Sequence, residues 1–419
     1  MNIERKDFLK HAIASYAFMA LVSSFGATAF GGVSIVCDYP GGSVIVRGID
    51  ETNGVVNLAP NLADTKGRKW MRFDFKVRGA EGRTLHFQFP DDKFSYLATL
   101  GPAVSRDGGR SWAWLNQDGS RHEPANAFDW TFASDERETR FAFCIPYLQS
   151  DWEKLAAKYS SRNDVVFDVL CRSQSGERDT ELLRLPCRGE ANWLFVFTAR
   201  HHASEAPANF VMEGAIEECL SESKEADWLR DNADCVFVPF MDKDGVEKGE
   251  QGKFRHPHDH NRDYMKDRYT SVRALKGLLS KEGEGKKIVF LDLHSPSARS
   301  GRKGNKIHDH TFTIAPHAPM QKERWRHFCR AWIDLQKNAL LKYGGKFDKA
   351  GSAKEYTAAV KKRSLNSRQY VGSLSNCWMS VCCEFGYSLS DGVYTQQGAR
   401  ELGANMLKAA VQTACGGVL

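Results

Sequence analysis

The chain has 419 residues, of which 42% are hydrophobic and 26% are charged, and its formal net charge is +6 at pH 7. This is the composition of a globular protein, and the length exceeds that of most single compact domains, so we expect two domains. The small positive charge is spread along the chain without a Lys/Arg block, which argues against a nucleic-acid-binding protein.

The first 29 residues have the pattern of an export signal. They contain three basic residues, an apolar run and then Ala27-Thr28-Ala29, an A-x-A cleavage pattern. We therefore predict a signal peptide over residues 1–29, for export by the Sec or the twin-arginine pathway. The mature chain would then be secreted or periplasmic, without a membrane span. An uncleaved membrane anchor is the alternative. Export would permit disulfides, but the number of cysteines is eleven, so at least one thiol stays free or pairs between chains.

Residues 30–146 have the pattern of an antiparallel β-sandwich. Short runs such as SVIVRGI, KWMRFDFKV, RTLHFQF and ETRFAFCI alternate apolar with polar residues and are separated by Gly, Asp and Asn turns. The segment SRDGGRSWAWL predicts a hairpin, because Asp-Gly-Gly supplies residues that tolerate a positive φ between two strands.

Residues 147–419 predict an α/β domain with helices on both faces of a mixed, largely parallel sheet. A helical segment, SDWEKLAAKYSS, is followed by apolar runs that alternate with helical patterns, which is typical of parallel strands joined by helices. The apolar runs are DVVFDVL, ELLRLP, NWLFVFTA, ADCVFVPF, KKIVFLDLH and CWMSVCCEF. Helices are predicted over 207–220, 264–280, 319–342 and 396–413.

Metal-ligating residues follow two of these predicted strands. NWLFVFTA runs into His202 and Glu205, and IVFLDLHS places His294 at the end of its strand. The carboxyl ends of parallel strands meet at one edge of a sheet, so two imidazoles and a carboxylate would come together there. That is the ligand set of a catalytic zinc with an open position. A polar turn without a metal is the alternative for the first segment.

Two further segments carry charged residues at the same predicted edge. The loop after ADCVFVPF contains Arg255 and the pair Asn261-Arg262, and the guanidinium of Arg can grip a carboxylate or stabilise an oxyanion. The run CWMSVCCEFGYS ends its apolar part at Glu384, a carboxylate that is either paired structurally or used in chemistry. The histidines of RHPHDHNR are expected to be loop residues around a cleft rather than a second metal site.

In order and context these segments resemble the zinc metallocarboxypeptidases, or funnelins, and most of all the cytosolic-carboxypeptidase-like branch with its N-terminal β-sandwich. FDVLCRSQSGERDTELLRL resembles the family's entry strand, TARHHASE its Thr-Ala-Arg-x-His-x-x-Glu segment, VPFMDKDG its Pro-x-x-Asn-Pro-Asp-Gly turn, DHNRDY its Asp-Leu-Asn-Arg, and LDLHS its last ligand strand. The chain departs from the family at Cys171, Lys243 and His260, which replace Gly, Pro and Leu. The resemblance covers nearly all of residues 32–415.

The resemblance implies one Zn²⁺ per chain, held by His202, Glu205 and His294, with His202 rather than His201 as the first ligand. The implied reaction is hydrolysis of the C-terminal residue of a peptide or protein. Since the signal predicts export, cell-wall peptides are among the expected substrates.

The other roles implied by the resemblance belong to four residues. Asn261 and Arg262 would bind the terminal carboxylate of the substrate, and Arg255 would polarise the scissile carbonyl and stabilise its oxyanion. Glu384 would be the general base, which takes a proton from zinc-bound water and passes it to the leaving amine. The six positions from Arg255 to Asn261 are a short gap for the family.

Four positions carry secondary hypotheses. Asp292, two before His294, would point to the same side of its strand and could orient that ligand, and a plain structural role is the alternative for it. Arg368 would line the side-chain pocket and favour an acidic C-terminal residue, and a surface salt bridge is the alternative for it. Tyr356 and Tyr370 are the candidates for the family's active-site tyrosine.

Three rival functions stay open at this point. A zinc deacylase or amidohydrolase, such as the aspartoacylase-like branch, and a murein peptide hydrolase would use the same scaffold. A binding protein that has lost catalysis is the other alternative. The Asn-Arg pair and the β-sandwich argue against the deacylase, and intact candidates for the ligands and the base argue against loss of catalysis.

Overall fold

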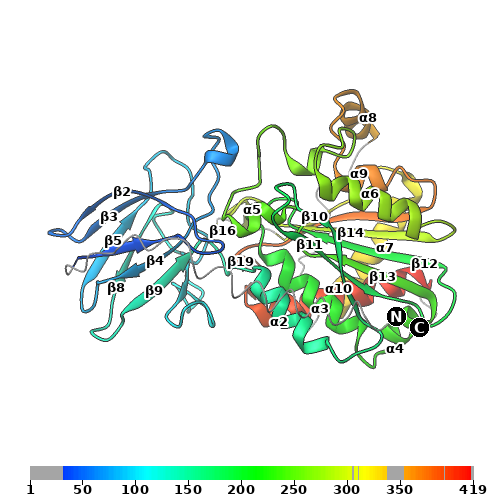
Figure 1. Cartoon of the computed structure of the whole chain (residues 1–419), viewed down its shortest axis with the longest axis horizontal. Helices are drawn as coiled ribbons and strands as arrows, with labels where there is room; N and C mark the ends of the chain where they lie inside the picture. The colour runs from blue at the N-terminus through cyan, green and yellow to red at the C-terminus, as the bar shows by residue number, and fades with distance from the viewer. Residues whose placement is uncertain (1–31, 304–305, 310, 337–352, 391, 417–419) are drawn as a thin grey trace. The chain divides into compact units, whose positions relative to one another are not determined.

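The computed structural model (Figure 1) describes residues 32–303, 306–309, 311–336, 353–390 and 392–416. The predicted export segment, residues 1–29, lies outside this part of the chain. Within the described residues, no helix is long and apolar enough to cross a membrane.

The N-terminal strands form two sheets that pack face to face. The first sheet contains, in order, β1 (Ser34–Val36), β4 (Asp74–Arg78), β9 (Glu138–Ala142), β6 (Ala103–Ser105) and β7 (Ala113–Trp114), and the second contains β2 (Ile45–Asp50), β3 (Val55–Ala59), β5 (Thr84–Gln88) and β8 (Ala127–Thr131). All pairs are antiparallel except β3 and β5. The ring of Phe87 lies 5.8 Å from Phe75 and 5.3 Å from Phe141 of the other sheet, so aromatic side chains fill the core. The predicted hairpin is confirmed as β6 and β7.

A seven-stranded mixed sheet follows. Its order is β10 (Val166–Arg172), β11 (Asp179–Leu185), β13 (Ala233–Val238), β12 (Trp193–Ala199), β14 (Lys287–His294), β18 (Cys377–Glu384) and β17 (Phe312–Ile314). The four strands from β13 to β18 are parallel. β11 and β17 run antiparallel to them, and the edge strand β10, antiparallel to β11, runs in the same direction as the four. Every residue of β12 is buried, as expected for a central strand covered on both faces.

Helices cover both faces of this sheet (Figure 1). α3 (Pro207–Cys219), α4 (Lys224–Asn232), α7 (Pro319–Leu335) and α10 (Gln396–Ala414) cover one face, and α6 (Thr270–Glu282) and α9 (Ser367–Val371) cover the other. The remaining helical segments are η1 (Ala63–Thr65), α2 (Gln149–Tyr159), α5 (Lys243–Glu247), η2 (His260–Arg262) and α8 (Ala353–Lys361). Two short hairpins complete the described elements, β15 (Gly301–Lys303) with β16 (Lys306–His308) and β19 (Leu389–Ser390) with β20 (Gly392–Val393).

A close contact between α3 and α10 depends on two glycines. A Cβ on Gly214 would lie 1.9 Å from the carbonyl oxygen of Arg400, and one on Gly403 would lie 1.8 Å from that of Val211. The two backbones therefore touch, and this contact holds α3, the helix that follows Glu205 directly.

The predicted fold class, a β-sandwich followed by an α/β/α domain with a mixed sheet, is confirmed. The helices predicted at 207–220 and 396–413 match α3 and α10 to within one residue. The helix predicted from 264 begins at Thr270 instead, because residues 263–269 form a turn in which Asp263 accepts a hydrogen bond from the backbone of Tyr269. The predicted helix 319–342 is observed up to Leu335, and its last six positions lie outside the described residues.

Candidate metal centre and active site

A strained turn follows the central strand β12. Arg200 has a φ of +62°, a conformation that costs a non-glycine residue about 1–3 kcal/mol. Its buried guanidinium donates hydrogen bonds to the carbonyl oxygens of Ala203 and Tyr147 and to Oδ1 of Asn209. These bonds hold the turn in place, and the turn presents His202 and Glu205 at the carboxyl edge of the sheet.

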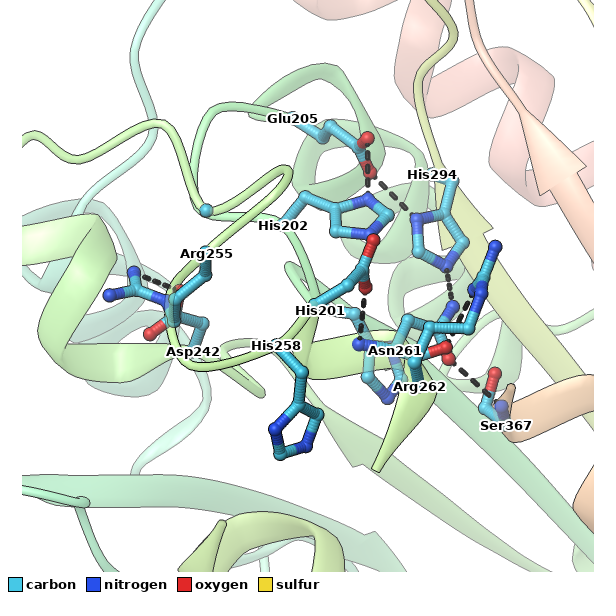
Figure 2. A network of polar contacts seen from close by, with 12 residues as sticks. His201, His202, Glu205, Asp242, Arg255, His258, Asn261, Arg262, His294 and Ser367 are labelled. Atoms are coloured by element: carbon cyan, nitrogen blue, oxygen red, sulfur yellow. Dashed lines mark hydrogen bonds and ion pairs between the residues drawn. The ribbon is translucent and has the colours of Figure 1, made fainter. Parts of the chain in front are cut away.

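Two histidines direct the same ring nitrogen at one carboxylate (Figure 2). Nδ1 of His202 lies 2.8 Å from Oε1 of Glu205, and Nδ1 of His294 lies 2.7 Å from Oε2. All three side chains are buried, and one ligand atom from each lies within 4.8 Å of the others. Two imidazole nitrogens and a carboxylate that converge in this way fit a zinc ion by the chemistry of the donors.

A second carboxylate lies behind each ring. Nε2 of His202 is 3.1 Å from Oδ1 of Asp259, and Nε2 of His294 is 2.8 Å from Oδ2 of Asp292. Such contacts fix the orientation of a metal-binding imidazole and keep its other nitrogen free for the metal. The hypothesis that Asp292 orients His294 thus has a direct contact to support it.

Asp292 also belongs to a second possible ligand group, with His201 and His294. Its oxygens already accept hydrogen bonds from Thr198 Oγ1, Asn261 Nδ2 and Ser367 Oγ. In addition, Nδ1 of His201 lies 2.9 Å from Oδ1 of Asp292, and Nε2 of His201 lies 2.8 Å from the hydroxyl of Tyr264. Because these contacts use the lone pairs of Asp292, the group around Glu205 is the better metal site.

The electrostatics of this cluster favour positive charge beside Glu205. Burial raises the pKa of Glu205, but the facing His202 and His294 outweigh it and hold the pKa well below its ordinary value. Burial lowers the pKa of His294, yet Asp292 and Glu205 outweigh it and raise the pKa well above its ordinary value. A cation at this position is therefore stabilised by the surrounding carboxylates.

Glu384 ends β18 directly beside His294, its register partner on β14. Its Oε2 atom is buried and has no hydrogen-bond partner among the residues that the structure describes. Burial raises the pKa of Glu384, with His294 opposing this shift and the negative charge of Glu205 adding to it. A carboxylate with a raised proton affinity and an unused oxygen next to the cluster is suited to proton transfer.

Asn261 and Arg262 lie next to His294. Nδ2 of Asn261 is 2.8 Å from Nε2 of His294, and its Oδ1 accepts a hydrogen bond of 2.8 Å from the backbone of Ser367. The guanidinium of Arg262 donates to the carbonyl oxygen of Asn261, and it has no ion pair within the described part of the chain. Arg262 is therefore a half-buried cation beside the cluster.

Arg255 is held elsewhere. Its guanidinium lies 3.0 Å from Oδ2 of Asp242 and 2.6 Å from Oε2 of Glu250. Figure 2 shows the side chain directed toward Asp242 and away from His202, Glu205 and His294. The structure thus places Arg255 near the site without bringing its charge to the cluster.

Arg368 is buried on α9, with 4% of its surface exposed. It donates to the carbonyl oxygen of Ala315, its Nε has no partner, and no ion pair to it is seen in the described residues. Burial lowers the pKa of Arg368 and outweighs the charges of Glu355 and Asp292, which act to raise it. Of the two candidate tyrosines, Tyr356 stacks on His317 at 4.0 Å, and the positive charge of Arg368 acts on His317. Tyr370 packs against the ring of Tyr264 at 5.5 Å, and both candidate tyrosines border the same apolar cluster, on the face of the sheet covered by α6 and α9.

The histidine-rich loop takes no part in a second metal cluster among the described residues. Nε2 of His258 lies 2.6 Å from Oδ1 of Asp263, and His260 is buried against the ring of Tyr269 at 4.3 Å.

All eleven cysteines are free thiols.

Sequence reasoning missed three residues that support the cluster: Asp259, Thr198 and Ser367. The only signal for Asp259 was an acidic residue two positions before Asn261. Thr198 lies in a fully apolar-looking strand, and Ser367 opens α9, so neither differs from an ordinary structural residue in the sequence.

Comparison with known proteins agrees with this geometry. Residues 149–297 match the zinc carboxypeptidase family. The chain is 25% identical over 265 residues to cytosolic carboxypeptidase 6 of Caenorhabditis elegans, covering 58% of this chain and 57% of the relative. It is 28% identical over 211 residues to cytosolic carboxypeptidase 2 of Xenopus tropicalis, covering 44% of this chain and 22% of that relative. The chain thus spans less than two thirds of the length of these relatives.

Two solved structures share the fold over nearly their whole length. A metallo-carboxypeptidase from Burkholderia cenocepacia has a TM-score of 0.72 and 17% identity, with 92% of this chain and 99% of that chain covered. A metallo-carboxypeptidase from Pseudomonas aeruginosa, in complex with (2-guanidinoethylmercapto)succinic acid, has a TM-score of 0.72 and 21% identity, with 91% and 99% covered.

The expectation that the chain is secreted or periplasmic is wrong. The curated relatives that it matches are cytosolic carboxypeptidases, and this finding contradicts the prediction of export. The prediction of export depended on composition alone, because a short apolar run followed by small residues resembles a signal peptide. The expectation of cell-wall substrates rested on export and loses its basis. The family match thus places a zinc carboxypeptidase domain over residues 149–297, and the curated relatives and solved structures that resemble the chain are cytosolic carboxypeptidases and metallo-carboxypeptidases.

Proposed function

We propose that this protein is a zinc-dependent carboxypeptidase that hydrolyses the C-terminal residue of a peptide or protein. One observation carries the proposal. Nδ1 of His202 and Nδ1 of His294 converge on Glu205 beside the unpaired carboxylate oxygen of Glu384. This arrangement combines a metal-ligand set with a proton-transfer group, which peptide hydrolysis by a metallopeptidase needs.

His202, Glu205 and His294 would hold one zinc ion per chain. When bound, zinc would act as a Lewis acid toward the scissile carbonyl and lower the pKa of water. Asp259 and Asp292 would keep the two imidazoles oriented from behind, as their contacts to Nε2 of each ring suggest.

Glu384 is the proposed general base. Its free Oε2 would take a proton from the attacking water and deliver it to the leaving amine. The raised pKa supports the first half of this task, because a carboxylate that binds a proton more tightly than usual accepts it more readily.

Arg262 and Asn261 are the proposed partners of the substrate's terminal carboxylate. The guanidinium of Arg262 has no competing ion pair in the described residues, so its charge is available to a ligand. Arg255 is the proposed group that polarises the scissile carbonyl, and it would have to exchange its contacts with Asp242 and Glu250 for the substrate oxygen.

Arg368 supports a preference for acidic C-terminal residues. A buried arginine without an ion pair is costly, and a substrate carboxylate would supply the missing partner. We propose that its guanidinium binds the side chain of a C-terminal Glu or Asp.

A residue-release assay tests the function. The purified protein is incubated with peptides ending in Glu, Leu or Lys, and the products are resolved by mass spectrometry together with the zinc content. Release of one C-terminal residue is expected, and Glu384→Gln should lose about 10²–10⁴-fold in turnover with its zinc retained. Glu213→Gln, which changes a buried glutamate of α3 that pairs with Arg400, is the control and should keep turnover.

Two results would contradict the proposal. Unchanged activity in Glu384→Gln would remove this residue from its role as base. A zinc-loaded wild type that leaves all peptides intact but releases the acyl group of an N-acylated amino acid would favour the deacylase.

A further inference from the structure

Ser204 stands between two proposed zinc ligands and is contacted by the β-sandwich. The indole N–H of Trp70, which lies just before β4, donates a hydrogen bond of 3.2 Å to Oγ of Ser204. Both side chains are buried, with exposed fractions of 8% and 1%. The residues are 134 positions apart, so this contact ties an N-terminal strand region to the turn that carries His202 and Glu205.

A second contact runs through Gln251. Its side-chain amide accepts a hydrogen bond from the backbone N–H of Arg72 and donates to the carbonyl oxygen of Arg72, both at 2.9 Å. The same amide donates to the carbonyl oxygen of Asn61 at 2.9 Å. Gln251 is fully buried, so its amide acts like an additional peptide unit paired with the backbone at Arg72.

The loop around Gln251 rests directly on the zinc-ligand turn. The backbone N–H of Ser204 donates to the carbonyl oxygen of Gln251 at 3.2 Å. The next residue, Gly252, has a φ of +72°, and a Cβ there would lie 2.1 Å from the backbone nitrogen of Ala203. Asp64 accepts a hydrogen bond of 2.8 Å from the N–H of Gly252 and so holds the loop from the sandwich side.

From these contacts we infer that Trp70 and Gln251 are positioning residues, through which the β-sandwich sets the place of the turn that bears His202 and Glu205. The inference rests on the proposed function, because it concerns the proposed zinc ligands. The sheet fixes the turn only where β12 ends, and α3 fixes it only after Glu205. Between these points Arg200 holds the turn at Ala203, and the sandwich adds the hydrogen bond from Trp70 to Ser204 and the contacts through Gln251. A metal site needs its ligands held to within about 0.5 Å.

The test compares zinc affinity in two matched tryptophan variants. Trp70→Phe removes the indole N–H that contacts Ser204. Trp114→Phe removes an equally buried indole N–H, which donates to the carbonyl oxygen of Tyr394 at 2.7 Å, far along the chain from the zinc-ligand turn. Zinc affinity is measured by competition with a chromophoric chelator, and thermal unfolding of the metal-free proteins is measured in parallel.

We expect Trp70→Phe to lower zinc affinity about 10-fold, at the low end of the effect of groups behind a metal ligand, and Trp114→Phe to leave it unchanged. Ser204→Ala should reproduce the loss. The double variant, with both Trp70 and Ser204 replaced, should lose no more zinc affinity than either single variant, because each substitution removes the same hydrogen bond.

Equal zinc affinities in the two tryptophan variants would overturn the inference, as would losses that multiply in the double variant. If Trp70→Phe fails to fold, Ser204→Ala decides alone, since it removes only one hydroxyl: a 10-fold loss supports the inference and an unchanged affinity overturns it. A folded wild type that binds no zinc would instead overturn the proposed function.

Discussion

Replacing Asp292 by Asn tests how the proposed zinc site is oriented. The substitution keeps the shape of the side chain but removes the negative charge that lies 2.8 Å from Nε2 of His294. Without that charge the imidazole is less basic, and the direction of its Nδ1 toward Glu205 is less firmly fixed. Zinc affinity should therefore fall even though no ligand has been changed.

The size of the effect follows from the contacts of Asp292. Loss of a carboxylate behind a metal-binding histidine costs about 10–100-fold in metal affinity, or about 1.4–2.8 kcal/mol. The metal-free protein should also lose stability, because Asp292 is fully buried and accepts hydrogen bonds from three side chains. An amide retains one acceptor oxygen, so we expect a loss on the order of 2–4 kcal/mol in the free energy of unfolding.

Asp309→Asn is the matched control. Asp309 is also fully buried, and its carboxylate accepts hydrogen bonds from Thr99, Arg299, Ser388 and Leu389, with no histidine among these partners. The Asp309→Asn variant should lose about as much stability as Asp292→Asn but keep the zinc affinity of the wild type. Chelator competition measures the affinity and denaturant unfolding measures the stability. A zinc affinity within about threefold of wild type in Asp292→Asn would refute the reasoning.

Three further predictions concern the chemistry of the site. Arg255→Met should lower kcat about 10²–10³-fold if Arg255 polarises the carbonyl, whereas Lys253→Met on the same loop should change it less than threefold; the opposite result would assign the role to Lys253. Because neighbouring carboxylates outweigh burial and raise the pKa of His294 well above its ordinary value, zinc uptake at pH 7 should release its proton, and zinc affinity should rise with pH up to that pKa. Calorimetry in buffers of different ionisation enthalpy measures the release, and none would contradict the assignment of this ligand. Arg368→Met should lower kcat/KM for Glu-terminated peptides about 10–100-fold and spare Leu-terminated ones, while equal losses would exclude a specificity role.

The convergence of the proposed zinc ligands could be predicted because each of them follows an apolar strand. NWLFVFTA and IVFLDLHS are buried on both faces, so their runs are long and clear, and parallel strands bring their carboxyl ends to one edge. The structure confirms that His202, Glu205 and His294 come together, with Glu384 beside them. Their roles in catalysis remain predictions.

The surroundings of the cluster could not be predicted because loops without periodicity supply them. Asp259 lies 57 positions from His202, and nothing in RHPHDHNR indicates which of its polar side chains turns inward. The same limit applies to Arg255. The sequence shows a cation within reach of a substrate, but not that Asp242 and Glu250 from neighbouring turns already engage it.

The charges of the site favour a divalent cation at this position. Four carboxylates surround two imidazoles: those of Glu205, Asp259, Asp292 and Glu384 around His202 and His294. Ionised, the carboxylates carry four negative charges, and protons on the two rings could offset at most two of them. A divalent cation supplies the same two positive charges while the rings become neutral ligands. Binding of such a cation would therefore offset part of the negative charge of the carboxylates that orient the ligands.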